Sequence, residues 1–335
     1  MTICKGNPVF GEFFGPRAVR SAHFSKASSQ PLIRADSGAW SRDFIAACSI
    51  VEHEGELRLY AEGSADDHEQ IGLFTRPIED IEGEWSPHPA NPVLRVGDEN
   101  ADAYSQGGVF DPSVVYFRGR WLMYFSATEG DAHEYAEQLA HGTAGDGPSG
   151  ESIGLAISDD GIAFSKHPDG PVMRGRCPFA FVHQDVIYLF HVIVHDGGYR
   201  VHLSSSSDGV RFSAVSENPV LDVGAEGSWD SRSVTTPKVF ADGDRFWMAY
   251  AGDESGFDDL KGLGLAWSTG LLTWTKIDAN PILGIGDDGD FDSVSVQSPI
   301  IIPANDSFAL FYAGSDRTVG EHLRSQIGLA WLTTR

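Results

Sequence analysis

The stretch FDPSVVYFRGRWLMYFSA at residues 110–127 decides the predicted fold. It has the pattern of an apolar strand, a turn at Gly119, and a second apolar strand that ends in aromatic and small residues. Variants of this hairpin occur elsewhere as AACSIVEHEGELRLYAEG at 46–63, RCPFAFVHQDVIYLFHV at 176–192, TTPKVFADGDRFWMAYAG at 235–252 and QSPIIIPANDSFALFYAG at 297–314. A unit that recurs along a chain indicates a repeat architecture.

Two further strands follow each hairpin. The third strand is of one type, as in IGLAIS at 153–158 and LGLAWS at 263–268, and the fourth often closes on Asn-Pro. Equivalent residues near the starts of the five hairpins are Cys48, Pro112, Pro178, Pro237 and Pro299. They lie 64, 66, 59 and 62 residues apart. Four antiparallel strands at this period indicate a β-propeller, whereas a β-sandwich would not repeat one strand sequence along the whole chain.

We therefore predict an all-β fold, a single five-bladed β-propeller domain of four-stranded antiparallel blades that spans residues 1–335. The blades are expected at about residues 40–94, 105–173, 174–221, 229–283 and 291–335. The last repeat stops after Trp331 without an Asn-Pro strand, whereas the chain starts with Asn7-Pro8-Val9-Phe10. We expect residues 7–10 to supply the missing outer strand of the last blade, the alternative being a coincidental Asn-Pro turn.

Composition excludes several classes of partner. The chain of 335 residues carries a formal net charge of −24, a field that repels nucleic-acid phosphates and anionic lipid headgroups. No apolar stretch reaches the ~18 residues of a membrane span, and no signal peptide is readable, so the expected location is the cytoplasm. Cys4, Cys48 and Cys177 are too scattered for a disulfide framework and are expected to be reduced. The oligomeric state stays open.

Loops at one face of a propeller are the expected place for function, because a rigid scaffold holds them. Three loops that enter a first strand carry equivalent pairs, namely Tyr104-Ser105, Trp229-Asp230 and Phe291-Asp292. The longest insertion, residues 128–152, is expected to form a lid over the channel. Its residues His133, Glu137 and His141 would share one helical face, which we interpret as a solvated acidic surface. We predict neither a metal site nor a cofactor.

The predicted blades, their channel-lining first strands and the run Phe110-Asp111-Pro112 together resemble the five-bladed β-propeller glycosidases. That superfamily includes the invertase/levanase enzymes, the arabinanase/β-xylosidase enzymes and the mannoside phosphorylases. In the invertase-like group, an Asp-Pro in the first blade carries the nucleophile and an Arg-Asp-Pro in the second stabilises the transition state. A Glu-Cys in the third blade supplies the acid. The resemblance in strand pattern covers nearly the whole chain, but a fold-level match says little about the reaction.

The superfamily's motifs are only partly present. Asp111-Pro112 matches the second-blade motif, with Phe110 where the family has Arg. The third-blade match is Arg176-Cys177-Pro178, so that Arg176 replaces the acid Glu. In the first blade Ala47 aligns with Asp111, and the nearest carboxylate is Asp43. Glycoside hydrolysis ordinarily needs two carboxyl groups, so we predict Asp43 and Asp111 as the catalytic pair. Acids at the ends of second strands are candidates for the missing Glu, namely Glu62, Glu129, Asp253 and Asp316.

Other residues are predicted to bind the substrate. Arg176 would hold a substrate carboxylate or phosphate, the alternative being a salt bridge to Asp111 or Asp43. Trp229, Asp230 and Arg232 would form a sugar platform, and Asp292 is a further candidate for substrate binding. Asp230 and Asp292 share one position in the repeat, so a repeated loop anchor is the equally weighted alternative for them. His191 interrupts an apolar strand, where a core histidine is the favoured interpretation and a ligand contact the second.

These features predict a glycoside hydrolase-like, carbohydrate-active enzyme. We expect it to act on a small glycoside, a furanoside in the first instance, in the central channel and with acid/base carboxylates. Two alternatives stay open: a non-catalytic sugar-binding propeller, and a propeller that carries out non-hydrolytic chemistry on a specialised metabolite. The sequence leaves open the sugar, the linkage and the choice between retention and inversion.

Overall fold

The computed structural model describes residues 9–10, 22–35, 39–65, 68–97, 103–129, 151–255, 260–304, 307–319 and 322–334. In this part of the chain regular structure is almost entirely β, as predicted. Two short 3-10 helices, η2 (Ala39–Ser41) and η3 (Ala103–Ser105), precede inner strands. None of the helices in the described residues is long and apolar enough to cross a membrane.

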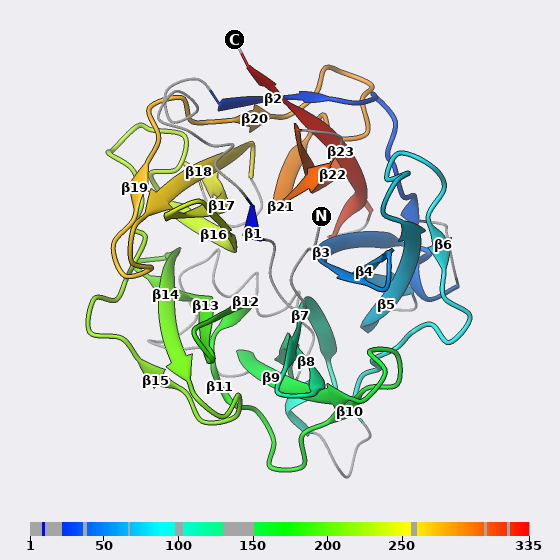
Figure 1. The fold of residues 1–335 in the computed structure, drawn as a ribbon. Helices are drawn as coiled ribbons and strands as arrows, with labels where there is room; N and C mark the ends of the chain where they lie inside the picture. Colours follow the sequence, from blue (N-terminus) through cyan, green and yellow to red (C-terminus); the bar gives the residue numbers. More distant parts are fainter. Residues whose placement is uncertain are drawn as a thin grey trace.

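The strands form antiparallel sheets arranged around a common centre (Figure 1), and we name each sheet by its innermost strand. The β3 sheet contains β3 (Phe44–His53), β4 (Glu56–Ala65), β5 (His68–Pro77) and β6 (Ser86–Pro87). The β7 sheet contains β7 (Gly108–Phe117), β8 (Arg120–Thr128), β9 (Glu151–Ser158), β10 (Ser165–Lys166) and β11 (Met173–Arg174). One parallel pair, Glu69 with Gly108, links these two sheets.

The β12 sheet contains β12 (Arg176–His183), β13 (Val186–His195), β14 (Gly198–Ser206) and β15 (Ser213–Ala214). The β16 sheet contains β16 (Ser233–Asp242), β17 (Arg245–Asp253), β18 (Gly262–Ser268), β19 (Thr275–Lys276) and β20 (Leu283–Gly284). The β21 sheet contains β21 (Ser295–Ala304), β22 (Ser307–Val319), β23 (His322–Thr334) and β2 (Ala22–Lys26).

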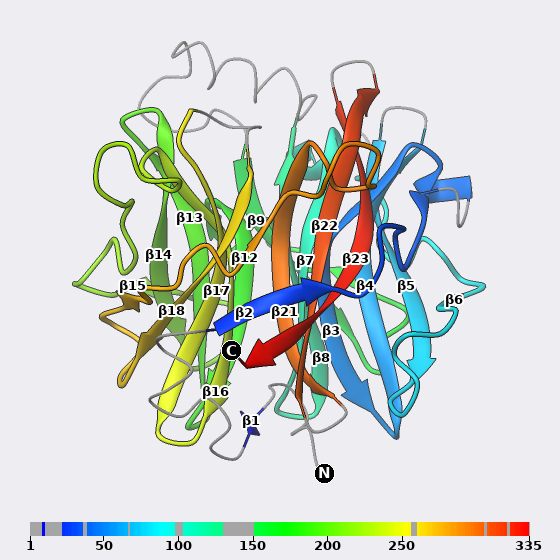
Figure 2. The same ribbon diagram turned by 90° about the horizontal axis from the view of Figure 1, so that it is seen from above.

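The innermost strands contact one another in order. β3 contacts β7, β7 contacts β12, β12 contacts β16, β16 contacts β21, and β21 contacts β3. In side view the long strands run from one face of the molecule to the other (Figure 2). Hydrogen bonds join residues near the starts of neighbouring inner strands, as between Asp111 and Glu62, Cys177 and Ser126, and Ser298 and Thr236.

Apolar side chains fill the space between neighbouring sheets. One buried cluster joins Tyr60 and Leu73 of the β3 sheet to Met123 and Phe125 of the β7 sheet. Such packing between repeated sheets is the hydrophobic core of a repeat architecture, in which each unit buries its face against its neighbours. It gives the loops that lead into the inner strands a rigid support.

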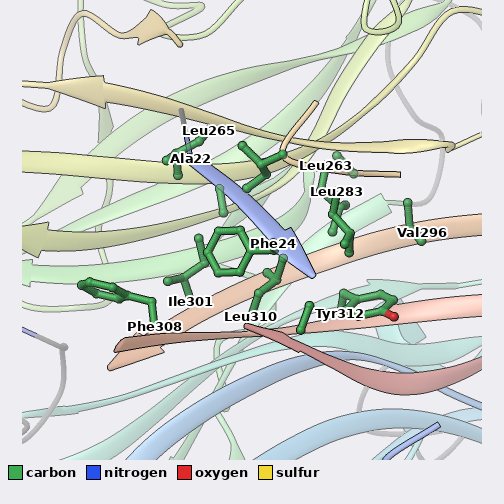
Figure 3. Close-up of a cluster of buried hydrophobic side chains, with 14 of the residues drawn as sticks. Ala22, Phe24, Leu263, Leu265, Leu283, Val296, Ile301, Phe308, Leu310 and Tyr312 are labelled. Carbon is green, nitrogen blue, oxygen red and sulfur yellow. The ribbon is translucent and has the colours of Figure 1, made fainter. Parts of the chain in front are cut away.

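The strand that completes the β21 sheet is β2, and it comes from the N-terminal part of the chain. Ala22 pairs with Thr334 and Lys26 with Ala330, both of β23. The side chain of Phe24 is buried between Leu263 of the β16 sheet and Leu310 of the β21 sheet (Figure 3). Strand β2 therefore joins sequence-distant segments and seals the last sheet against its neighbour.

The sequence prediction gave this outer position to residues 7–10, and the structure corrects it. Val9 and Phe10 form β1, which pairs in parallel with Ala241 and Asp242 of β16. Residues 7–8 lie outside the described residues. The outer strand is recognised by its alternating burial, in which Ala22 and Phe24 are buried and their neighbours are less so. An Asn-Pro pair does not mark it.

A repeated clamp ties outer strands to the loops before inner strands. Lys276 of β19 lies with its Nζ 2.6 Å from Asp230 Oδ2, and Lys26 of β2 lies 2.6 Å from Asp292 Oδ2. In the β7 sheet the corresponding contact runs from Lys166 Nζ to Ser105 Oγ at 2.8 Å. Strand β2 thus has the same role in its sheet as β10 and β19 have in theirs.

We expect Lys26→Met to lower the free energy of unfolding by about 2 kcal/mol, because it leaves the fully buried Asp292 carboxylate without its cation. The effect falls short of a fully buried pair, because the Lys26 side chain is 19% exposed. Urea unfolding measures it. Arg211→Met, which removes an exposed ion pair with Asp208, is the control and should change stability by less than about 0.5 kcal/mol. Equal stabilities of the two variants would contradict the clamp.

Candidate active site

The inner strands share one irregularity near their starts. A β-bulge interrupts the pairing of each inner strand with its neighbour, between residues 46 and 48, 110 and 113, 176 and 179, 235 and 238, and 297 and 300. In four of them the residue before a proline has a positive φ of about 50°, namely Asp111, Cys177, Thr236 and Ser298. The backbone repeats while the side chain changes, so the chemistry near these strand starts depends on which residue occupies this position.

Asp111 is the carboxylate among these bulge residues, and it is almost fully buried. Its Oδ2 accepts a hydrogen bond from Ser126 Oγ at 2.8 Å, and Arg176 Nε lies 3.5 Å from the same oxygen. Its own backbone N–H donates to Glu62 Oε2 at 2.7 Å. Residues of three sheets therefore fix the position of this one side chain.

Glu151, at the start of β9, is a second buried carboxyl group close to Asp111, because both contact Arg176. Its side chain is 3% exposed, and Arg176 Nη1 donates to its Oε1 at 3.2 Å. Burial raises the pKa of Glu151 to about 7, with the Arg176 guanidinium opposing this shift and Asp111 adding to it. At neutral pH a large fraction of Glu151 is therefore protonated, although an ordinary glutamic acid would be ionised.

Arg176 links the two acids. Its guanidinium contacts both Asp111 and Glu151 and lies 4.9 Å from the centre of the Phe110 ring, where the aromatic face favours a cation. The Arg176 side chain is 26% exposed, more than either carboxyl group. Of the two predicted roles for Arg176, the structure contains the salt bridge to Asp111, extended to Glu151.

Glu62 lies against the backbone of Asp111, near the end of β4. Burial raises the pKa of Glu62 well above its usual range, and the neighbouring carboxylates of Asp111 and Glu69 add to this shift. Of the four acids proposed for the missing Glu, Glu62 is in contact with Asp111. Glu129 is exposed, Asp253 is buried, and Asp316 lies 4.0 Å from Arg317.

Asp43, the predicted partner of Asp111, precedes β3 and has a different neighbour. Its side chain is 42% exposed and lies 3.3 Å from Arg42 Nε, and its backbone N–H donates to the Ser64 carbonyl. The described contacts of Asp111 come instead from Glu62, Ser126 and Arg176. The structure therefore brings Asp111 together with Glu151 and Glu62. In the part of the chain that is described, Asp43 makes its ion pair with Arg42 and not with a partner of Asp111.

Glu151 was not among the predicted site residues. It stands opposite Thr128, the last residue of β8. Thr128 and residues 151–152, which the sequence analysis assigned to the lid at 128–152, are therefore strand residues. The prediction considered acids at the ends of second strands, whereas third strands begin at the same edge of each sheet. A search of both positions would have found it. Residues 130–150 of the predicted lid lie outside the described residues, as do His133, Glu137 and His141.

Two side chains of the predicted sugar platform, Trp229 and Asp230, contact other residues of the protein. Trp229 stacks on Tyr250 with ring centres 5.6 Å apart, and Gly252 and Gly262 leave the space that its ring fills, since a Cβ at either glycine would come within 2.7 Å of the indole. Asp230 is 3% exposed and holds the Lys276 clamp. Asp292 has the equivalent place with Lys26, so for both aspartates the loop-anchor interpretation fits the contacts. Arg232 lies beside the turn at Gly197.

His191 is buried on β13, opposite His202 of β14. Burial, together with the nearby His202, lowers the pKa of His191 to about 3, so the ring is neutral. Its Nε2 lies 3.5 Å from Ser204 Oγ, while Nδ1 has no hydrogen-bond partner within the part of the chain that is described. A core position is what the prediction favoured.

Within the described residues no group of three or more His, Cys, Asp or Glu side chains is arranged to hold a metal ion.

No protein-family model and no curated protein match this chain. Solved structures do. A structure from work on the GH130 family of mannoside phosphorylases, which contains glycoside hydrolases that target β-1,2 mannosidic linkages in Candida mannan, has a TM-score of 0.68 at 13% identity, over 93% of this chain and 94% of that one. A glycosyl hydrolase from Bacteroides ovatus has a TM-score of 0.67 at 12% identity, over 98% and 96%.

A third structure, the GH43_1 enzyme from Xanthomonas citri complexed with xylotriose, has a TM-score of 0.60 at 16% identity, over 93% of this chain and 91% of that one. Identities this low carry the fold and not the reaction. The resemblance predicted from the sequence is confirmed at that level, because the chain has the fold of the β-propeller glycosidases.

Proposed function

We propose that this protein cleaves the glycosidic bond of a small glycoside, with Asp111 and Glu151 as the two reacting carboxyl groups. The observation that carries the proposal is that both side chains are buried and share the Arg176 guanidinium. Two carboxyl groups in environments that separate their protonation are the requirement of glycoside hydrolysis.

The contacts suggest a division of labour. Glu151, whose pKa burial raises to about 7, is the protonated group that donates a proton to the leaving-group oxygen. Asp111 accepts a hydrogen bond from Ser126 Oγ and lies beside the Arg176 guanidinium, and these two contacts hold its carboxyl group in place. In the proposed reaction the Asp111 carboxylate acts on the anomeric carbon directly or through a water molecule.

The same proposal includes a five-bladed propeller closed by β2. Its support is the order of contacts among the inner strands, from β3 through β7, β12, β16 and β21 back to β3, together with the pairing of β2 with β23. In this arrangement the central opening is lined by the bulge residues. The acids then stand where a substrate enters.

The proposed substrate is a neutral glycoside, with furanosides first. The net charge of −24 disfavours an anionic substrate, and Arg176 is already paired with two carboxyl groups. The furanoside preference comes from the resemblance of the sequence to arabinanase/β-xylosidase enzymes. Binding of a sugar without chemistry is the second candidate, because Arg176 occupies the position where the superfamily's acid is expected.

A substrate panel tests the proposal. Nitrophenyl furanosides and pyranosides, together with short arabino- and fructo-oligosaccharides, are incubated with the protein, and released nitrophenol or sugar is measured. We expect turnover of at least one compound. Compounds that are not cleaved are then titrated by calorimetry, where binding without turnover would favour the sugar-binding candidate. Absence of both turnover and binding across the panel would contradict a glycoside site.

A further inference from the structure

Glu62 occupies a position that a small or apolar residue occupies in the other sheets. It pairs with Ala46, the residue directly before the bulge of β3. The residues at the same register in the other sheets are Ser126, Val192, Ala251 and Ala313. Glu62 is thus the carboxylic acid at this register, and the repeat alone does not explain it.

The hydrogen bond from Glu62 has a close parallel in the next sheet. Glu62 Oε2 accepts the backbone N–H of Asp111 at 2.7 Å, and Ser126 Oγ accepts the backbone N–H of Cys177 at 2.9 Å. In both cases a side chain of one sheet holds the bulge residue of the following sheet. The contact at Asp111 therefore belongs to a recurrent way of fixing the bulge, with a longer side chain as the acceptor.

The bulge at Asp111 needs such support. Its φ of 50° lies in the left-handed region, which non-glycine residues rarely adopt. Its N–H is directed away from the ladder of β8, because the pairing is interrupted between Phe110 and Ser113. A buried N–H without an acceptor is costly, so Glu62 stabilises the conformation that points the Asp111 carboxylate at Ser126 and Arg176.

We infer that Glu62 is a positioning residue, which holds the backbone of Asp111 so that its carboxylate stays at the reacting position, and that Glu62 does not donate the proton. This inference rests on the proposed function of Asp111 and Glu151. Glu62 contacts the backbone of Asp111, whereas the Arg176 guanidinium joins the carboxyl groups of Asp111 and Glu151. Burial raises the pKa of Glu62, which favours its neutral form. A neutral carboxyl group still has an oxygen that accepts the Asp111 N–H, so the positioning role does not need a negative charge.

Two substitutions separate a positioning role from proton donation. Glu62→Gln keeps an acceptor oxygen at the same reach and has no acidic proton. Glu62→Ala removes the acceptor. We expect Glu62→Gln to retain kcat within about threefold, and Glu62→Ala to lower kcat by about 10²-fold, the typical loss when a reacting group is misplaced by about 1 Å. The alkaline limb of the pH profile should be the same in wild type and Glu62→Gln.

A second readout does not depend on turnover. Hydrogen exchange of the Asp111 amide, followed by mass spectrometry of a peptide from β7, reports whether its N–H keeps an acceptor. We expect at least tenfold faster exchange in Glu62→Ala and wild-type exchange in Glu62→Gln. Glu56→Ala is the matched control on the same strand, because its exposed side chain lies near Arg58 and should affect neither readout.

The outcomes are distinct. If Glu62→Gln folds with normal Asp111 exchange but loses turnover as fully as Glu62→Ala, Glu62 donates the proton and the inference is wrong. If Glu62→Ala leaves the exchange of the Asp111 amide unchanged, the positioning role is wrong as well. If wild type cleaves nothing, the proposed function fails, while the exchange rates still decide whether Glu62 holds Asp111.

Discussion

Asp111→Asn is expected to lower kcat for every cleaved glycoside by about 10³-fold or more, while the protein melts within a few degrees of wild type. Asparagine has nearly the shape of aspartate, and its carbonyl oxygen can still accept the hydrogen bond from Ser126 Oγ. It cannot supply the negative charge that attacks the anomeric carbon or activates water. Initial rates on the best substrate of the panel, with thermal melts of both proteins, measure the effect.

Asp43→Asn is the comparison that decides which carboxyl group works with Asp111. Asp43 is partly exposed and paired with Arg42, so its loss should change kcat by less than about threefold. A loss equal to that of Asp111→Asn would restore the pairing of Asp43 with Asp111 that the sequence predicted. It would also remove Glu151 from the proposed mechanism.

The sequence predicted the all-β class and the importance of Asp111, because both depend on local pattern. Strands of one repeat share apolar alternation, and the bulge before a proline recurs at Asp111, Cys177, Thr236 and Ser298. Aligning the repeats was enough to show that one of these positions carries an acid. The equivalence of Asp230 and Asp292 was also visible, and their shared lysine clamp explains it.

What the sequence could not predict depends on contacts between repeats. Glu151 falls in the segment predicted as a lid, and it joins the site because β9 pairs with β8 in a register that puts it opposite Thr128. Strand β2 lies more than 290 residues before β23 in the chain, and its short alternation resembles that of many surface strands. In both cases the partner surface, and not the local sequence, selects the residue.

Glu151→Gln is expected to abolish the alkaline limb of the pH profile and to lower kcat by about 10²–10⁴-fold on substrates with poor leaving groups. The pKa of Glu151 is raised to about 7, so the fraction that carries a proton falls as pH rises through that value. A general acid works only when protonated, so wild-type kcat/KM should fall above about pH 7, approaching tenfold per pH unit. Profiles of kcat/KM from pH 5 to 9 measure this.

Leaving-group chemistry separates this role from a structural one. A dinitrophenolate departs without protonation, whereas a sugar alkoxide does not, so Glu151→Gln should cleave a dinitrophenyl glycoside at a rate close to that of wild type. A substitution that merely disturbed the fold, or that released Arg176 from its ion pair, would slow both substrates to the same extent. Equal losses on the two leaving groups would therefore exclude Glu151 as the proton donor, and retention of the alkaline limb would do so independently.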